Sequence, residues 1–212
     1  HHVVQRSPWL RDLPPEVAVL SAIAFCVSIG FGILAPSIPV FARSFGVTAL
    51  EASAVISGMA LARLIMSPFS GILGNRFGER VILTTGLFLV ALTSLAAGMS
   101  QNYWQLLFWR GITGVGSSMF TVSALALLLR VSKPDQRGRA ASAFQGGFLL
   151  GGVAGPAFGG IIVAWSIRAP FFVYAASLLV AAIVSWVFLA KAKLQELEAV
   201  VSNGQEEKTE SL

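Results

Sequence analysis

The stretch GGVAGPAFGG, residues 151–160, places five glycines and one proline inside the apolar run 140–164. On a helix, glycines four residues apart share one stripe, and these are Gly147, Gly151, Gly155 and Gly159. An adjacent stripe holds Gly152, Pro156 and Gly160. Such a face lets another helix approach closely inside a membrane. It fits packing within one bundle or a contact between two halves of a larger protein.

Five further apolar runs accompany this one. The six are residues 17–42, 52–73, 81–99, 104–129, 140–164 and 171–190. Each is long enough as a helix to cross about 30 Å of hydrocarbon, and none shows the alternation of a barrel strand. Only 12% of the residues are charged, against about 25% in soluble domains, and the mean hydropathy is +0.76. The sequence therefore predicts an all-α, multi-pass membrane protein with six transmembrane helices.

The charges between the runs predict the topology. Basic residues gather before the first run, after the second, after the fourth and after the sixth: Arg6, Arg11, Arg76, Arg80, Arg130, Lys133, Arg137, Arg139, Lys191 and Lys193. The opposite side carries Arg43 and Arg168. By the positive-inside rule both termini are cytoplasmic, so the net charge of +5 reflects topology and no nucleic-acid partner is expected. We divide the chain into a leader, 1–16, a six-helix lobe, 17–190, and a polar tail or interlobe linker, 191–212.

Several chemistries lack the residues they need. The one cysteine is Cys26, the two histidines are His1 and His2, and no run contains Asp, Glu, Lys or His. A metal or haem site needs Cys or His ligands, and an intramembrane protease needs a Ser/His pair or paired carboxylates. We therefore expect no enzyme activity, no metal and no cofactor.

The connection between the second and third runs has the order GILGNRFGER, residues 71–80. By composition it is a tight hairpin anchored by Arg76 and Arg80. The order of Gly71, Asn75, Arg76, Gly78 and Arg80 also resembles the signature between helices 2 and 3 of the major facilitator superfamily of transporters. That signature usually has Asp where this chain has Asn75, so a charge-dependent gating contact there is expected to be weaker or built differently.

Three more elements resemble the same family in the expected order. Helix 1 carries Gly30, Pro36 and Pro39, and the prolines are expected to distort its outer third. Helix 4 carries Arg-x-x-x-Gly-x-Gly from Arg110 to Gly116. Residues 151–160 resemble the helix-5 element of the drug/proton antiporter branch, which in that family lies along the contact between two halves. The resemblance makes that contact the favoured role of the glycine face.

The resemblance implies one lobe of a twelve-helix protein, built as a 3+3 inverted repeat. It implies a cell-membrane transporter that exports small molecules in exchange for protons by alternating access. Its partners would be the lipid bilayer, a small-molecule substrate and a second six-helix lobe, either a C-terminal half or another copy. Two alternatives stay open: a non-transporting half-protein that assembles with or regulates another membrane protein, and a transporter of organic anions without proton coupling.

Arg110 is the candidate substrate or coupling residue, because a charge inside a membrane must face protein or water. Gly114, Ser117 and Thr121 share its helix face, which suits the wall of a water-filled cavity, and Gln145 of the fifth run could reach it. The alternative for Arg110 is a structural arginine bonded to helix carbonyls. For Arg63 the structural role is favoured. Together the two arginines could also attract an anionic substrate.

Overall fold

The computed structural model describes residues 13–210, and this part of the chain is helical with short connections. Its helices are α1 (Pro15–Leu34), α2 (Ser37–Arg43), α3 (Ala49–Phe77), α4 (Glu79–Gly98), α5 (Tyr103–Val131), α6 (Arg137–Trp165) and α7 (Ala169–Glu210). Six membrane-length helical segments result, with α1 and α2 together forming the first. This confirms the predicted all-α, six-span class. Most of the predicted leader, 1–12, lies outside the described residues.

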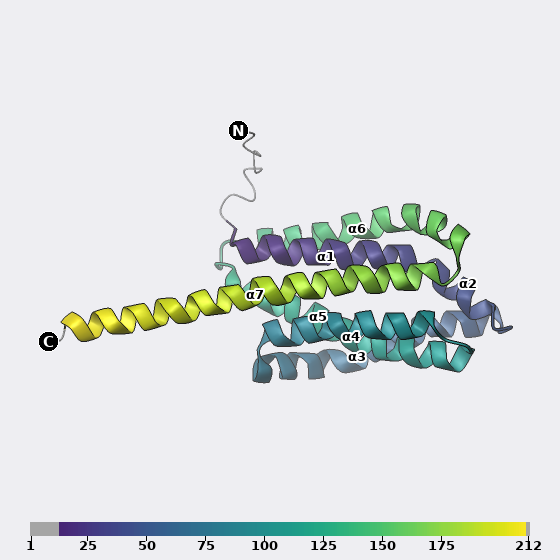
Figure 1. The fold of residues 1–212 in the computed structure, drawn as a ribbon, viewed down its shortest axis with the longest axis horizontal. Coiled ribbons are helices and arrows are strands. Elements are labelled where there is room, and N and C mark those ends of the chain that lie inside the picture. The colour runs from purple at the N-terminus through teal and green to yellow at the C-terminus, as the bar shows by residue number, and fades with distance from the viewer. Residues whose placement is uncertain (1–12, 211–212) are drawn as a thin grey trace, which may run out of the picture.

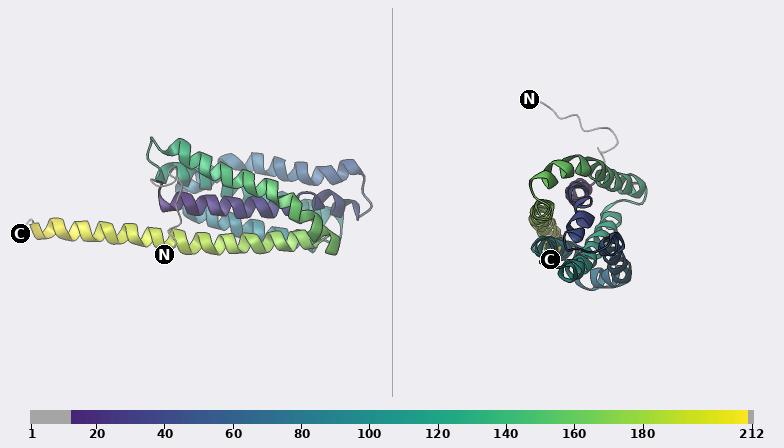
Figure 2. Two further views of the ribbon diagram at one scale, coloured as in Figure 1. Left: turned by 90° about the horizontal axis from the view of Figure 1, so that it is seen from above. Right: turned by 90° about the vertical axis from the view of Figure 1, so that its right-hand side faces the viewer.

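The six spans lie side by side as one bundle (Figure 1), and the end-on view in Figure 2 shows them arranged around its axis. α1 begins at the end of the bundle where α7 leaves it. α1 packs chiefly against α6, and α5 packs against α3 and α4. The first three spans, α1 with α2, α3 and α4, form one half, and α5, α6 and α7 form the other. The first span of each half thus lies against the second span of the other half. α7 completes the bundle between α4 and α1.

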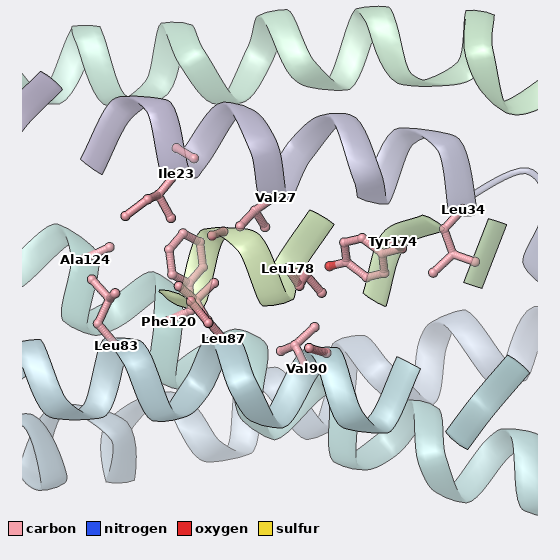
Figure 3. Packing of buried hydrophobic residues seen from close by; sticks show 14 of the residues in the cluster. Ile23, Val27, Leu34, Leu83, Leu87, Val90, Phe120, Ala124, Tyr174 and Leu178 are labelled. Atoms are coloured by element: carbon pink, nitrogen blue, oxygen red, sulfur yellow. The ribbon is translucent and has the colours of Figure 1, made fainter. Parts of the chain in front are cut away.

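Aliphatic and aromatic side chains from α1, α4, α5 and α7 fill the centre of the bundle. Figure 3 shows Ile23 and Val27 of α1 opposite Leu87 and Val90 of α4, with Leu178 of α7 between them. These side chains are almost completely shielded. Because lipid is as apolar as this core, close packing rather than exclusion of water holds the helices together.

α3 and α6 are the least covered helices. In the most apolar stretch of each, 17% of the residues are buried. The corresponding share is 56% in the span formed by α1 and α2, in α4 and in α5. Each contacts mainly one or two neighbours, α6 on α1 and α3 on α5. Both therefore present long faces that the described part of the chain does not cover.

The first span is broken as its prolines predict. α1 ends at Leu34 and α2 starts at Ser37, so the break falls at Ala35 and Pro36. Pro39 lies in the first turn of α2, where a proline needs no intrahelical N–H partner. The predicted distortion of this span at its prolines is confirmed.

Candidate functional site

Arg110 is fully buried on α5. One terminal nitrogen, Nη2, lies 2.7 Å from the Sδ atom of Met59 on α3. Nε and Nη1 have no hydrogen-bond partner among the described residues. A buried guanidinium with one weak sulfur acceptor is costly, since a charge without a counter-ion loses its hydration. Two of its donor groups are therefore available to an acceptor that the described residues do not supply.

The polar stripe below Arg110 faces α3 rather than an open cavity. A Cβ added at Gly114 would collide with the carbonyl oxygen of Met59 and lie 3.1 Å from the Cβ of Ala62. Ser118 Oγ lies 2.7 Å from Ser70 Oγ of α3. The prediction of an open, water-filled wall at Arg110 and Gly114 is therefore wrong. Small and hydroxyl side chains serve a close helix contact as well as a wet wall, and the pattern alone does not separate the two.

Arg63 of α3 joins this contact. Its Nη2 donates to the Oγ1 of Thr121 on α5 across 3.1 Å, and the side chain is half-buried. The hydroxyl of Thr121 in turn donates to the carbonyl of Ser117 at 2.8 Å. In the structural role expected for Arg63, its hydrogen-bond partner is thus Thr121. Ser117 is half-buried on the same stretch of α5.

Gln145 differs from these residues in its environment. It is exposed on α6, while Arg110 is enclosed between α5 and α3. The sequence predicts that both residues line one cavity, whereas the structure leaves one exposed and buries the other completely.

Tyr174 of α7 is a member of the interior that sequence reasoning missed. It is 3% exposed and belongs to the apolar cluster at the centre of the bundle. Figure 3 shows it among Leu178, Leu34 and Val90. Gly30 makes room for its ring, because a Cβ there would lie 2.6 Å from Cδ2 of Tyr174. The signal available in the sequence was a lone tyrosine in the sixth apolar run.

The glycine stripe of α6 packs against α1 within this chain. A Cβ at Gly151 would lie 2.6 Å from the carbonyl oxygen of Phe25, and one at Gly159 would lie 2.7 Å from that of Ile33. Ser28 of α1 donates to the carbonyl of Phe148 across the same contact. The favoured prediction, a surface between two lobes, is therefore wrong for this stripe, because α1 already occupies it.

The second stripe is more exposed. Gly152, Pro156 and Gly160 are exposed, and a Cβ at Gly160 would meet nothing within 4 Å. Near α1 the stripe is closer, since a Cβ at Gly152 would lie 3.3 Å from Oγ of Ser28 and a Cβ at Gly32 would lie 3.1 Å from Cδ of Pro156. The helix-5 element thus has one face buried against α1 and a second face that borders α1 at Gly152 and Pro156 and is open at Gly160. The sequence could not divide the element because both faces consist of small residues and proline.

The 71–80 connection is shorter than its motif suggests. α3 ends at Phe77, α4 starts at Glu79, and Gly78 alone joins them with a φ of 94°. Asn75 and Arg76 are exposed, and the Arg76 guanidinium lies 5.7 Å from the centre of the Phe77 ring. Gly71 faces α5, with 3.9 Å between an added Cβ and Cγ1 of Val122, while Arg80 is half-buried at the start of α4.

Glu79 is the second site that the sequence did not single out. Its carboxylate accepts from Nη2 of Arg130 at 2.7 Å, and the Glu79 side chain is only 7% exposed. Arg130 stands in the last turn of α5, so the pair ties the start of α4 to the end of α5. A carboxylate and a guanidinium 51 positions apart become neighbours only in the folded bundle.

Drug-resistance proteins are among the known proteins that are similar to this chain. It is 28% identical over 178 residues to the Quinolone resistance protein NorA of Staphylococcus aureus, a match covering 82% of this chain and 45% of that protein. It is 28% identical over 176 residues to Multidrug resistance protein 2 of Bacillus subtilis, covering 83% and 44%. The chain thus spans less than half the length of these relatives. The family model of the Major Facilitator Superfamily matches residues 20–211, and the chain belongs to that superfamily.

Proposed function

We propose that this chain is the N-terminal lobe of a proton-coupled exporter of small molecules that works by alternating access. The observation that carries the proposal is the incomplete covering of a six-span lobe: 17% of the most apolar stretch is buried in α3 and in α6, against 39% in α7 and 56% in the other three spans. Relatives named for quinolone and multidrug resistance, of which this chain matches less than half, support drug-like substrates and a second lobe.

The second lobe would pack on the bare faces of α3 and α6. On α6 the surface available to it is the outer stripe of Gly152, Pro156 and Gly160, since the inner stripe is filled by α1. Small residues there allow a partner helix to come close without a cavity. Gln145 lies on the same exposed flank of α6, where the substrate path between two lobes would run.

Arg110 would act in coupling rather than as part of an open wall. Two of its donor groups lack acceptors among the described residues, and arginine itself does not deprotonate. A carboxyl group that approaches this guanidinium would be stabilised in its charged form. In this proposal that group comes from the second lobe or from the substrate, and Ser117, Thr121 and Gly114 hold α5 at the distance from α3 that keeps Arg110 in place.

The connection around Gly78 would take part in gating at the cytoplasmic side. Arg76 and Asn75 are exposed there and can contact a second lobe, while the Glu79–Arg130 pair fixes the ends of α4 and α5 beneath them. We place both termini in the cytoplasm of a cell-membrane protein, because basic residues gather at this end. The described start of α1 and the departure of α7 lie at one end of the bundle.

The first experiment is the mass of this chain in mild detergent, corrected for bound detergent. A dimer would allow a flux assay on the chain itself, in vesicles with a proton gradient and ethidium as the probe. A monomer would direct the same assay to a longer protein that contains this lobe. Ethidium export that stops when an uncoupler removes the gradient supports the proposal, and export that continues overturns proton coupling.

A transporter of organic anions is the second candidate, and the two arginines favour it. Arg63 and Arg110 are the only charged residues within the six apolar runs, so the interior is positive. This candidate would be supported if uptake of an organic carboxylate dye did not depend on the proton gradient and ethidium were not exported.

A further inference from the structure

An apolar groove opens on the outside of the lobe, at the end where α1 begins. It has a volume of about 630 Å³, within the range of small-molecule pockets. Its floor comes from α1 at Ala18 and Ser21, and its walls come from Ala143 and Leu150 of α6 and Phe188 of α7. Ser21 donates its hydroxyl to the carbonyl of Val17 at 2.8 Å, so the one polar side chain of the floor is satisfied.

The groove lies on the flank of α6 away from the proposed lobe contact. At about 100° per residue, Ala143, Gly146 and Leu150 fall on one side of the stripe that packs on α1. Gly152 and Pro156 fall on the other side. A second lobe seated on that outer stripe leaves the groove facing outward. In a multi-pass membrane protein, an outward apolar surface of a spanning helix faces hydrocarbon.

Two cations lie about one helical turn from residues that line the groove. Arg139 precedes Ala143 by four residues on α6, so both lie on one helix face. Lys191 follows Phe188 by one turn on α7 and is exposed. Both continue the groove toward the side rich in basic residues. The one acid of α1, Glu16, lies between the lining residues Pro15 and Val17, and it lines a second pocket together with Glu79 and Arg130.

We propose that this groove binds one acyl chain of an anionic phospholipid, with the headgroup phosphate between Arg139 and Lys191. The apolar lining fits a hydrocarbon chain, because no unmet polar group of the floor opposes it. The cations fit a negatively charged headgroup at the level where the helices leave the hydrocarbon. The lipid would hold the starting ends of α1 and α6 and the outgoing α7 as one unit.

Gly146 provides a direct test of the groove. A Cβ added there meets nothing within 4 Å, so the side chain of Gly146→Phe can enter the groove without a collision at its first atom. Gly111→Phe on α5 is the matched control, since Gly111 also faces open space. Ala18→Phe fills the groove from α1. It serves as the second variant if Gly146→Phe has a lower melting temperature than the native chain.

The assay is native mass spectrometry of the purified full chain with dioleoyl phosphatidylglycerol or dioleoyl phosphatidylcholine. We expect the native chain to retain phosphatidylglycerol preferentially. Gly146→Phe and Ala18→Phe should each lower the retained fraction roughly tenfold, and Gly111→Phe should leave it unchanged. Arg139→Gln and Lys191→Gln should each reduce the preference over phosphatidylcholine by roughly fivefold, with retention of phosphatidylcholine unaltered.

Three outcomes would overturn the site. The first is equal retention of phosphatidylglycerol by the native chain and both filled variants. The second is equal retention of the two lipids by the native chain, which removes the headgroup contact. The third is loss of a dimer of the chain in the filled variants with lipid retention intact, which would make a second copy the occupant.

Discussion

Gly155 of α6 and Gly32 of α1 meet backbone to backbone: a Cβ added at Gly155 would lie 2.5 Å from the Cα of Gly32 and 2.6 Å from the carbonyl oxygen of Ile29. No flexible side chain stands there to move aside. The role of Gly155 is therefore set by a helix of its own lobe, and its substitution is first a matter of bundle stability.

Replacing Gly155 with Ala should destabilise the lobe by about 1–3 kcal/mol, because the new methyl group overlaps rigid backbone. Gly160→Ala is the matched control on the same helix, since its Cβ meets nothing within 4 Å. Thermal unfolding in detergent, followed by circular dichroism, gives the comparison. Equal melting temperatures for the two variants would contradict the backbone contact.

Arg110→Leu should abolish proton-coupled export in the complete transporter while the lobe stays folded. Removing a buried charge that has no counter-ion relieves its desolvation cost, and this gain offsets the smaller volume of the leucine side chain. We expect an unchanged or higher melting temperature together with lost ethidium export. Full export by Arg110→Leu would remove Arg110 from the mechanism, and a much lower melting temperature would make its role structural.

Arg63 and Thr121 should show a small favourable coupling. A double-mutant cycle with Arg63→Gln and Thr121→Val is expected to give about 0.6 kcal/mol, as interhelical hydrogen bonds in membranes do. Denaturation in mixed micelles measures it. Thr85→Val, at an exposed threonine of α4, paired with Arg63→Gln is the control and should give no coupling. A coupling of zero for the first pair would mean that the hydrogen bond does not form.

Removing Arg130 should cost the lobe about 1 kcal/mol, since Glu79 then keeps a shielded carboxylate without its partner. The cost stays modest because the Arg130 side chain is 66% exposed and water screens the pair. Arg76→Ala is the control, because Arg76 is exposed and stacks on Phe77. The result to look for is a lower melting temperature for Arg130→Ala alone. If both variants melted together, the pair would have no stabilising effect.

Gly71 and Gly78 belong to one motif and should respond to alanine in opposite ways. Gly78 has a φ of 94°, so Gly78→Ala should destabilise by roughly 1–2 kcal/mol. Gly71 is helical with 3.9 Å of space toward Val122, so Gly71→Ala should be neutral or stabilising by up to about 1 kcal/mol. Melting temperatures that fall equally in both variants would contradict the single-residue connection.

The sequence was sufficient for the spans, because their length and hydropathy depend only on local composition. It also located the break near Pro36, since proline acts on its own helix. The sequence was insufficient to predict the surroundings of Arg110 and of the Gly155 stripe. Which helix each of these faces packs against depends on the arrangement of the neighbouring helices. Small and hydroxyl residues suit a helix contact and a wet wall alike. The Glu79–Arg130 ion pair could not be predicted from the sequence because the two residues are far apart in the chain.

The one-residue connection at Gly78 leaves no slack between α3 and α4. A longer loop would absorb a shift of one helix through its own torsions, at little cost in free energy. Here any displacement of the end of α3 has to appear at the first residue of α4, and the ion pair of Glu79 passes it on to the end of α5. Three helix ends at this side of the lobe are thus coupled in position. A partner that pushes on exposed Arg76 would move them together.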